Sequence, residues 1–364
     1  ARQAITTARR GSKSYGRAIG AAVSSALLLR RRDALDMLLA ELYRAEPDED
    51  AIPVLSFAYS SAIIALLVMG RREVAERFLQ RMKDVATSSL ARDPSVAGRF
   101  DYARGYWHRV AERDAFAALA LDREAAAHFT VSGDRRFLPL LWANIGFDLV
   151  LLGAHTEAEH ELGRAMRSAT AGSFPAVLAG TFQAALLTER GLFEQAITLG
   201  KTVSEQAAAQ GDSLLTVNAQ YFVLQAYLRS GDFLGARALL EEIEPSSEDV
   251  PGRGIWIPAA RATIELREGR AEQALEFTTA AIANGARFGM KHYLAESELL
   301  LIRAEVLHEV GRKEEALETL SRAREDILER GARIRDPAYA KSFVDKVFVH
   351  ARTLALWDAW TKSG

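Results

Sequence analysis

Cysteine is absent from the 364 residues of the chain. Disulfides, thiol nucleophiles and thiolate metal sites are therefore excluded together, and the absence is typical of proteins in the reducing cytosol. Acidic and basic residues nearly cancel, with 48 against 46, which leaves a formal net charge of −2. This balance argues against a protein that binds nucleic acid through a basic surface.

Long apolar runs and targeting signals are also lacking. We find no run of the roughly 20 apolar residues that a membrane-spanning helix needs. The N-terminus, Ala1-Arg2-Gln3, has neither an initiator methionine nor the apolar core of a signal peptide. We therefore expect no membrane segment, a cytoplasmic location, and a chain that is an excised segment of a longer protein.

Patterns that carry catalysis or bind metals are scarce as well. The seven histidines include no His-Glu-x-x-His pair, and no third ligand accompanies His155 or His160. Neither a Gly-x-Ser-x-Gly elbow nor a complete phosphate-binding loop occurs, because Gln195 stands where the loop ending in Gly200-Lys201-Thr202 needs its first glycine. We expect no enzymatic activity, no cofactor and no metal.

What the sequence does contain is a repeat. A glycine followed five residues later by an alanine recurs within helically patterned stretches, as Gly70/Ala75, Gly153/Ala158, Gly191/Ala196, Gly231/Ala236, Gly269/Ala274 and Gly311/Ala316. Two degenerate copies, Leu29/Ala34 and Val110/Ala115, fit the gaps, so the alanines recur about every 40 residues. The alanine lets two antiparallel helices approach closely, and the glycine supplies the turn between them.

The clearest copy runs from Trp142 to Ala158 and reads W-A-N-I-G-F-D-L-V-L-L-G-A-H-T-E-A. Its pattern resembles one tetratricopeptide repeat, a helix–turn–helix unit. The resemblance implies an all-α, right-handed superhelix of about eight repeats over residues 1–335, with Trp142 in the core. Because the period exceeds the usual 34 residues, the helices or the turns between repeats should be longer than in the commonest form.

Glycine followed by a polar residue marks several expected ends of second helices, at Gly133-Asp134, Gly172-Ser173 and Gly211-Asp212. Glycine suits the left-handed position after a helix, and Asp or Ser can cap the helix that follows.

Residues 336–364 follow the last repeat. Asp336-Pro337 is a good start for a helix, and Phe343, Val347 and Ala351 recur at helical spacing. We expect one C-terminal helix that caps the last repeat, since a solenoid needs a terminal element over its final apolar face. The segment also resembles the closing part of tetratricopeptide regions in large bacterial signalling proteins, which join a Ser/Thr kinase or a signalling ATPase to such repeats.

In tetratricopeptide arrays the first helix of each unit lines the concave groove. Carried over by their distance from the repeat alanines, the groove positions are Val23, Phe57, Ile64, Leu67, Phe100, Arg104, Trp107, His108, Phe147, Val150, Thr188, Glu189, Asn218, Tyr221, Gln225, Arg229, Trp256, Thr263, Arg267, Glu298, Glu305, His308 and Glu309. Aromatic, amide and arginine side chains are favoured at recognition surfaces. We therefore predict that six of them converge on one partner-binding face: Arg104, Trp107, Tyr221, Gln225, Arg229 and Trp256.

These features predict a protein–protein interaction and regulatory module within a larger bacterial signal-transduction protein, which binds a protein or peptide segment in its concave groove. The alternative is a sensor domain for a small-molecule inducer, because the repeat regions of LuxR-type ATP-binding activators are similar in period. The sequence leaves the ligand and the oligomeric state open, and we expect no direct binding to nucleic acid or membrane.

Overall fold

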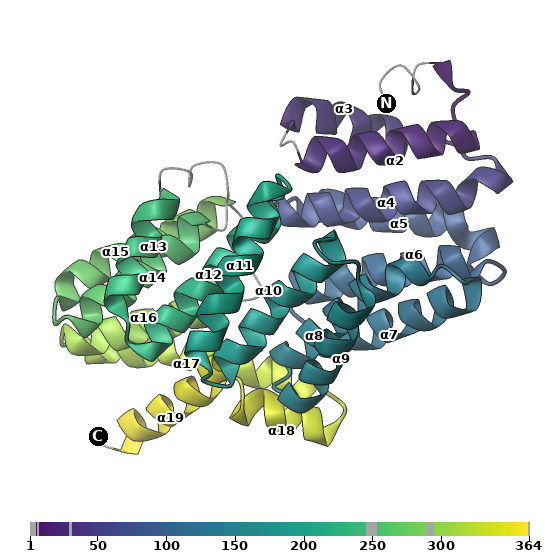
Figure 1. The fold of residues 1–364 in the computed structure, drawn as a ribbon. Coiled ribbons are helices and arrows are strands. Elements are labelled where there is room, and N and C mark those ends of the chain that lie inside the picture. The colour runs from purple at the N-terminus through teal and green to yellow at the C-terminus, as the bar shows by residue number, and fades with distance from the viewer. Residues whose placement is uncertain (1–4, 6, 29–30, 245–252, 289–294, 363–364) are drawn as a thin grey trace.

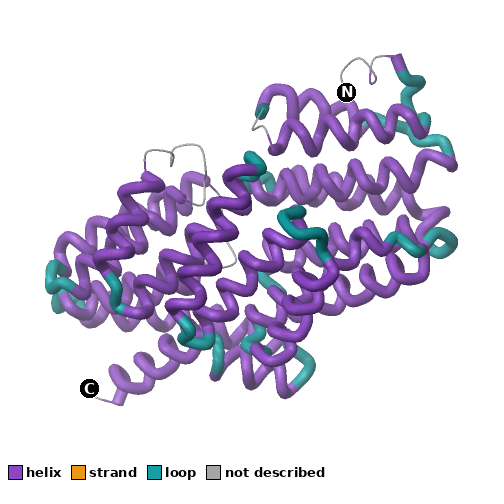
Figure 2. The backbone as a smooth tube through the Cα atoms, in the orientation of Figure 1, coloured by secondary structure: helices purple, strands orange, loops and turns teal. Residues whose placement is uncertain are grey.

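The computed structural model describes residues 5, 7–28, 31–244, 253–288 and 295–362. Within these ranges the chain consists of helices joined by loops and contains no strand (Figure 2). Successive helices stack side by side as pairs (Figure 1). The fold is thus an all-α solenoid of helix–turn–helix repeats, as the sequence predicts.

The described residues form eight helix pairs, which we number as repeats one to eight. They are α2 (Lys13–Leu28) with α3 (Arg32–Tyr43), α4 (Ile52–Val68) with α5 (Arg72–Leu90), α6 (Pro94–Trp107) with α7 (Ala115–Ser132), α8 (Leu138–Leu151) with α9 (His155–Ser168), α10 (Phe174–Glu189) with α11 (Phe193–Ala209), α12 (Ser213–Ser230) with α13 (Phe233–Ile243), α14 (Arg253–Arg267) with α15 (Ala271–Phe288), and α16 (Ala295–Glu309) with α17 (Lys313–Arg333).

The repeat glycines and alanines hold the positions that their pattern predicts. All six glycines that precede a repeat alanine adopt the left-handed conformation, at Gly70, Gly153, Gly191, Gly231, Gly269 and Gly311, with φ between 70° and 82°. Each repeat alanine lies on the second helix of its pair, and all except the half-buried Ala34 are buried. The predicted phase of the repeats is therefore confirmed.

The glycines expected at the ends of second helices also have positive φ: 77° at Gly133, 70° at Gly172 and 71° at Gly211. Only the last pair includes the predicted cap. Asp212 accepts hydrogen bonds from the backbone N–H groups of Leu214 and Leu215, whereas the polar residues of the other two pairs make no such bond.

Repeat three differs from the others at its turn. The first helix continues through η2 (His108–Glu112), a π-helical turn, and the left-handed residue is Arg113, with φ of 54°. It is the only non-glycine residue with positive φ in the described ranges. The repeat pattern predicts this turn at Val110, so the observed turn lies three residues later than predicted. A left-handed side-chain residue costs about 1–2 kcal/mol, so other contacts must hold Arg113 in place.

Trp142 is not the fully buried core residue that we expected. Its ring packs against the core of repeats four to six but remains half-buried. The guanidinium of Arg164, on the second helix of the same repeat, lies 3.9 Å from the ring centroid. An arginine covers this part of the ring in place of apolar side chains, a cation–π contact that the repeat pattern does not reveal.

One apolar segment is longer than the sequence analysis allowed. Glu49–Val68, which comprises η1 (Glu49–Ala51) and α4, is long and apolar enough to cross a membrane. However, 67% of its apolar window is buried inside the protein. A helix that is apolar all round is also what the centre of a helical array requires, and α4 packs against α2, α5 and α6.

The C-terminal tail forms two helices where one was expected, α18 (Pro337–Asp345) and α19 (Phe348–Lys362). The second half of α19 covers repeat eight, as a cap should. Trp357 and Trp360 pack against the cluster around Leu301 and Leu320, and the Trp360 ring stacks on His308 with the centroids 4.2 Å apart. This part of the capping prediction agrees with the structure.

The first half of the tail lies elsewhere. Figure 1 shows α18 beside α8 and α9. The Ser342 hydroxyl donates a hydrogen bond of 2.6 Å to the carbonyl oxygen of Leu152, and the Tyr339 hydroxyl donates one of 2.7 Å to Glu157. We call residues 337–348 the strap, because they connect repeat eight back to repeats four to six.

A second contact joins the two ends of the same array. The guanidinium of Arg113, at the turn of repeat three, lies 2.8 Å from Asp326 and 2.9 Å from Glu296, both of repeat eight. These ion pairs hold the strained turn residue. Together with the strap, they close repeats three to eight into a ring.

The turn of repeat four allows a test of this closure. A Cβ at Gly153 would overlap the carbonyl oxygen of Ser342 in the strap, whereas a Cβ at Gly211 would meet no described atom within 4 Å. Both glycines have φ near 70°. We expect Gly211→Ala to lower the free energy of unfolding by about 1–2 kcal/mol, and Gly153→Ala to lower it by about 1–3 kcal/mol more, because the strap must shift. Equal losses in denaturant unfolding would contradict the docking of the strap.

Candidate ligand-binding cavity

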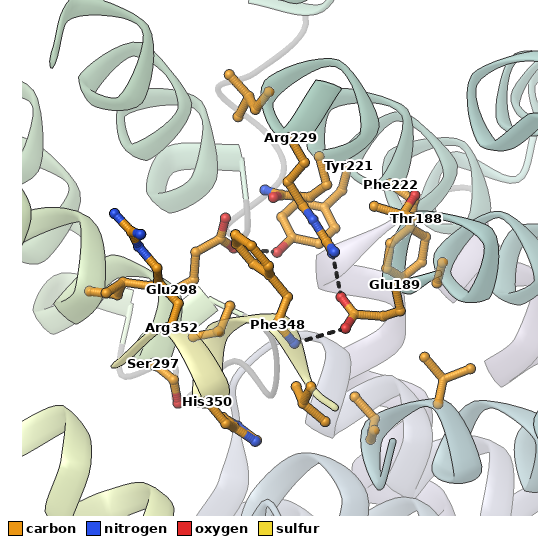
Figure 3. Close-up of a pocket in the computed structure, with 18 of the residues that line it drawn as sticks. Thr188, Glu189, Tyr221, Phe222, Arg229, Ser297, Glu298, Phe348, His350 and Arg352 are labelled. Carbon is orange, nitrogen blue, oxygen red and sulfur yellow. Dashed lines mark hydrogen bonds and ion pairs between the residues drawn. The ribbon is translucent and has the colours of Figure 1, made fainter. Parts of the chain in front are cut away.

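The ring surrounds a cavity of about 410 Å³, lined mainly by the first helices of repeats four to eight, by Arg109 and Arg113 of repeat three, and by the tail. Figure 3 shows side chains from α10, α12, α16 and α19 around this space. The volume is in the range of about 300–1,000 Å³ that is typical of small-ligand sites. The cavity combines an apolar wall, which includes Phe147, Val150 and Phe222, with several arginines and carboxylates.

The six predicted binding residues do not all meet in this cavity. Tyr221, Gln225 and Arg229 line it from α12. Trp256 of α14 lies behind that wall, with its ring centroid 5.8 Å from that of Tyr221, and is buried.

The other two residues of the predicted set lie on α6, outside the lining of the cavity. Arg104 pairs with Asp101 at 3.4 Å. Trp107 is buried, and the guanidinium of Arg72 covers its ring at 5.4 Å. A role in binding a partner stays a prediction for all six residues.

Other groove positions carried over from the repeat pattern do line the cavity. They are Phe147, Val150, Thr188, Glu189, Thr263, Arg267, Glu298 and Glu305. The phase of the first helices was therefore a good guide to which residues face inward in repeats four to eight.

Glu189, Arg229 and Phe348 form the most direct link between the repeats and the tail (Figure 3). Arg229 donates to one oxygen of Glu189 at 2.6 Å, and the backbone N–H of Phe348 donates to the other at 3.0 Å. The Arg229 guanidinium also lies 4.1 Å from the centroid of the Phe348 ring. Phe348 begins α19, so its N–H has no partner within the helix, and a carboxylate at a helix N-terminus is electrostatically favourable.

Glu298 is a different kind of carboxylate. The Tyr221 hydroxyl donates to it at 2.6 Å, and Gln225 provides a further hydrogen bond. Burial raises the pKa of Glu298 above its ordinary value. Within the described part of the chain, no lysine, arginine or histidine lies within ion-pair distance of it, although Glu189 and Glu305 each pair with an arginine.

Glu305 balances two cations at another part of the wall. Arg352 of α19 donates to it at 2.7 Å, and Arg267 of α14 lies 4.0 Å away. Both arginines are about half exposed, at 42% and 51% of their side-chain surface. Glu305 is therefore the carboxylate near both Arg267 and Arg352, and both guanidinium groups remain accessible from the cavity.

A buried ionic cluster supports the wall beside repeats three and four. Arg109 bonds to both oxygens of Asp148, at 2.6 and 2.9 Å, and also to Asp122. Both carboxylates are completely buried. Burial raises the pKa of Asp122 to about 8 and also raises the pKa of Asp148. One cation between two buried carboxyl groups leaves an excess negative charge, which a bound proton can remove.

A second polar network fixes the base of the tail. The Ser297 hydroxyl accepts from Arg113 at 3.0 Å and from Arg330 at 2.9 Å. His350 contacts the Phe343 carbonyl through Nδ1 at 2.8 Å and Arg330 through Nε2 at 3.2 Å. Burial lowers the pKa of His350 to about 3, so the ring is neutral and its Nδ1–H donates while Nε2 accepts.

The contribution of the tail and of the closing contacts does not follow from the repeat pattern. Arg113, Arg330, Phe348, His350 and Arg352 all line the cavity, yet none of them belongs to a groove position of the repeat pattern. A helical pattern in the tail reveals a helix but gives no information on where that helix docks. Only the absence of a turn glycine in repeat three signalled that its turn was unusual.

Comparisons with known proteins support the fold. No protein-family model and no curated protein sequence matches the chain. Among solved structures, a Rap protein complexed with competence and sporulation factor is similar, with a TM-score of 0.64, 14% identity, and coverage of 96% of this chain and 99% of that one.

Two further structures share the architecture. Aspartyl phosphate phosphatase F from Bacillus subtilis has a TM-score of 0.53 at 15% identity, covering 94% of this chain and 93% of that one. NprR in complex with its cognate peptide NprX has a TM-score of 0.50 at 13% identity, covering 95% and 87%. At such identities the likeness shows the fold alone. The class defined here is therefore a helical-repeat solenoid of the tetratricopeptide-like type.

The buried cluster around Arg109 makes stability depend on pH. The pKa of Asp122 is about 8 in the folded protein, against about 3.9 for an unfolded chain. The folded state therefore holds more protons, and the free energy of unfolding should fall as pH rises from about 4 to 8. Asp122→Asn cannot release that proton, so we expect a flatter dependence between pH 5 and 9 in denaturant titrations.

Asp326→Asn is the matched control. Burial opposes ionisation of Asp326, but the charges of Arg330 and Arg113 hold its pKa below the ordinary value. The stability that this group contributes is lost only in acid, as pH falls through that lowered pKa. Asp326→Asn should therefore leave the pH dependence of the free energy of unfolding unchanged between pH 5 and 9. If Asp122→Asn retains the parent's slope, the proton does not reside on Asp122.

Proposed function

We propose that the chain is a regulatory binding module that takes a short peptide segment into the cavity of its ring. The observation that carries this proposal is the cavity itself, which combines apolar walls with charged and hydrogen-bonding groups from five repeats. Support also comes from the likeness to a Rap protein solved with competence and sporulation factor and to NprR solved with its cognate peptide. Peptides need this combination, because their backbones are polar and many side chains are apolar.

The closed ring favours a short ligand over a long one. An extended segment that ran along all eight repeats would have to pass the strap, which contacts repeats four to six. A small-molecule inducer is the second candidate, because a volume of about 410 Å³ suits it as well. In either case we place the chain in the cytoplasm of a bacterium, as the sensing part of a larger signal-transduction protein.

We propose no catalytic step for the cavity. The carboxylates of Glu189 and Glu305 are each held in an ion pair with an arginine. The name of one structural relative, an aspartyl phosphate phosphatase, describes that protein. The arrangement of Glu189 and Glu305 is suited to recognition, where fixed charges orient a ligand.

Glu298 indicates what part of a ligand the cavity recognises. It is a carboxylate on the cavity wall whose hydrogen-bond partners are neutral groups, Tyr221 and Gln225. A charged group removed from water is stabilised when an opposite charge approaches. We therefore propose that a lysine or arginine side chain, or the free amino terminus of a peptide, binds at Glu298.

The test is affinity selection from a pool of random hexapeptides, followed by sequencing of the bound fraction. The parent should enrich peptides with a positive charge, and Glu298→Gln should weaken their binding by about tenfold or more, because it keeps the hydrogen bonds but removes the charge. Glu244→Gln is the control, since that carboxylate pairs with Arg261 outside the cavity lining. Unchanged selectivity in Glu298→Gln would rule out this role, and a pool without binders would favour the small molecule.

A further inference from the structure

The strap is attached very differently at its two ends. On the side of repeat eight, Phe343 is buried against Gly331 and His350, and His350 contacts Arg330. This end is part of the core.

On the side of repeats four to six, Tyr339, Ala340 and Val344 are only partly buried against the main core, and the strap is held by three hydrogen bonds. They are the bonds from Tyr339 to Glu157, from Ser342 to Leu152 and from Phe348 to Glu189. The Tyr339 ring adds an edge contact to Phe116 of repeat three, with the centroids 6.2 Å apart. The bonds of Tyr339 and Phe348 are exposed and contribute little to stability, so this seam depends mainly on the one buried bond of Ser342 and is the weaker attachment.

Phe348 occupies the part of the seam that faces the cavity. Its backbone N–H bonds to Glu189 and its ring lies under Arg229 (Figure 3). An N–H donor and an apolar side chain are also what a bound peptide presents. The backbone N–H and the side chain of Phe348 therefore occupy two groups that line the cavity, the carboxylate of Glu189 and the guanidinium of Arg229.

Phe348 is also easy to displace. Although it borders the cavity, 42% of its surface is exposed, so its removal exposes little new apolar area. The cap on repeat eight does not depend on it, because Trp357 and Trp360 hold the far end of α19. Release of the strap from repeats four to six leaves both the core contact of Phe343 and this cap in place.

We propose that Phe348 is an internal ligand, and that a peptide bound in the cavity takes its place on Glu189 and Arg229 and releases the strap from repeats four to six. This inference rests on the proposed function, because it describes how binding at that site is converted into a change of shape. The ring is closed in the free protein and opens at the strap when the site is filled. Movement of the strap would alter the surface at the junction of α18 and α19.

Hydrogen–deuterium exchange of the full chain, read by mass spectrometry over residues 337–348, tests the attachment without any ligand. Glu189→Gln and Phe348→Ala should each make the strap amides exchange about tenfold faster, because a hydrogen bond to a charged group or the contact with Arg229 is lost. Phe174→Ala is the matched control for the second variant, since Phe174 also begins a helix and is 44% exposed. Glu244→Gln is the matched control for Glu189→Gln. Neither control should change the exchange rate of the strap amides.

Addition of the hexapeptide pool to the parent tests the displacement. Exchange in residues 337–348 should rise while exchange in the helices that line the cavity falls. Unchanged strap exchange in both Glu189→Gln and Phe348→Ala would overturn the inference, and so would slower strap exchange on binding, which means that the strap closes over the ligand. The variant arm needs no ligand, so a pool that fails to bind counts against the proposed function and not against the attachment of the strap.

Discussion

The close approach of two helices at small residues is the constraint on which the rest of the structure depends. Where a glycine such as Gly146 or Gly180 lies between paired helices, a larger side chain would overlap the facing helix. A Cβ at Gly146 would meet the side chain of Leu162, and one at Gly180 would meet Val203. Each pair is too small to bury its own apolar face, so the pairs must stack, and stacking at a constant offset produces the solenoid. The positive-φ glycines make the tight connections between paired helices possible.

Closure of the array converts an open groove into a cavity bounded by repeats and tail. A solenoid is normally open along its concave side, but here the Arg113 ion pairs and the strap join repeat eight to repeats three to six. The more deeply placed residues of the lining, such as Arg113 and Arg229, lose most of their contact with water, and unpaired charges there become costly. Most charges around the cavity are accordingly paired, as with Arg109 between two aspartates and Arg229 with Glu189.

The same closure relates recognition to a change of shape. The side chains that a ligand can reach, Glu189 and Arg229, are also the ones that hold Phe348. A ligand that binds to Glu189 and Arg229 must therefore compete with Phe348 of the protein's own tail. Such competition is a two-state element of the kind that regulation requires, because the ligand interacts differently with the closed and open forms.

The sequence by itself determined the local geometry. Glycine at the turn and alanine at the helix contact are imposed by backbone sterics within about 40 residues, so the eight repeats could be predicted from their spacing. The resemblance to tetratricopeptide repeats then implied that Tyr221 and Arg229 face inward. The tertiary structure alone decided the closure of the ring, the exclusion of Arg104 and Trp107 from the cavity, and the entry of Phe348 into it. Closure and the cavity lining depend on the rotation between successive repeats. A small change in that rotation, added over several repeats, greatly changes the distance between the first and the last of them. Ser342 and Leu152 are 190 residues apart in the sequence. A local sequence pattern therefore cannot predict that the tail contacts this turn.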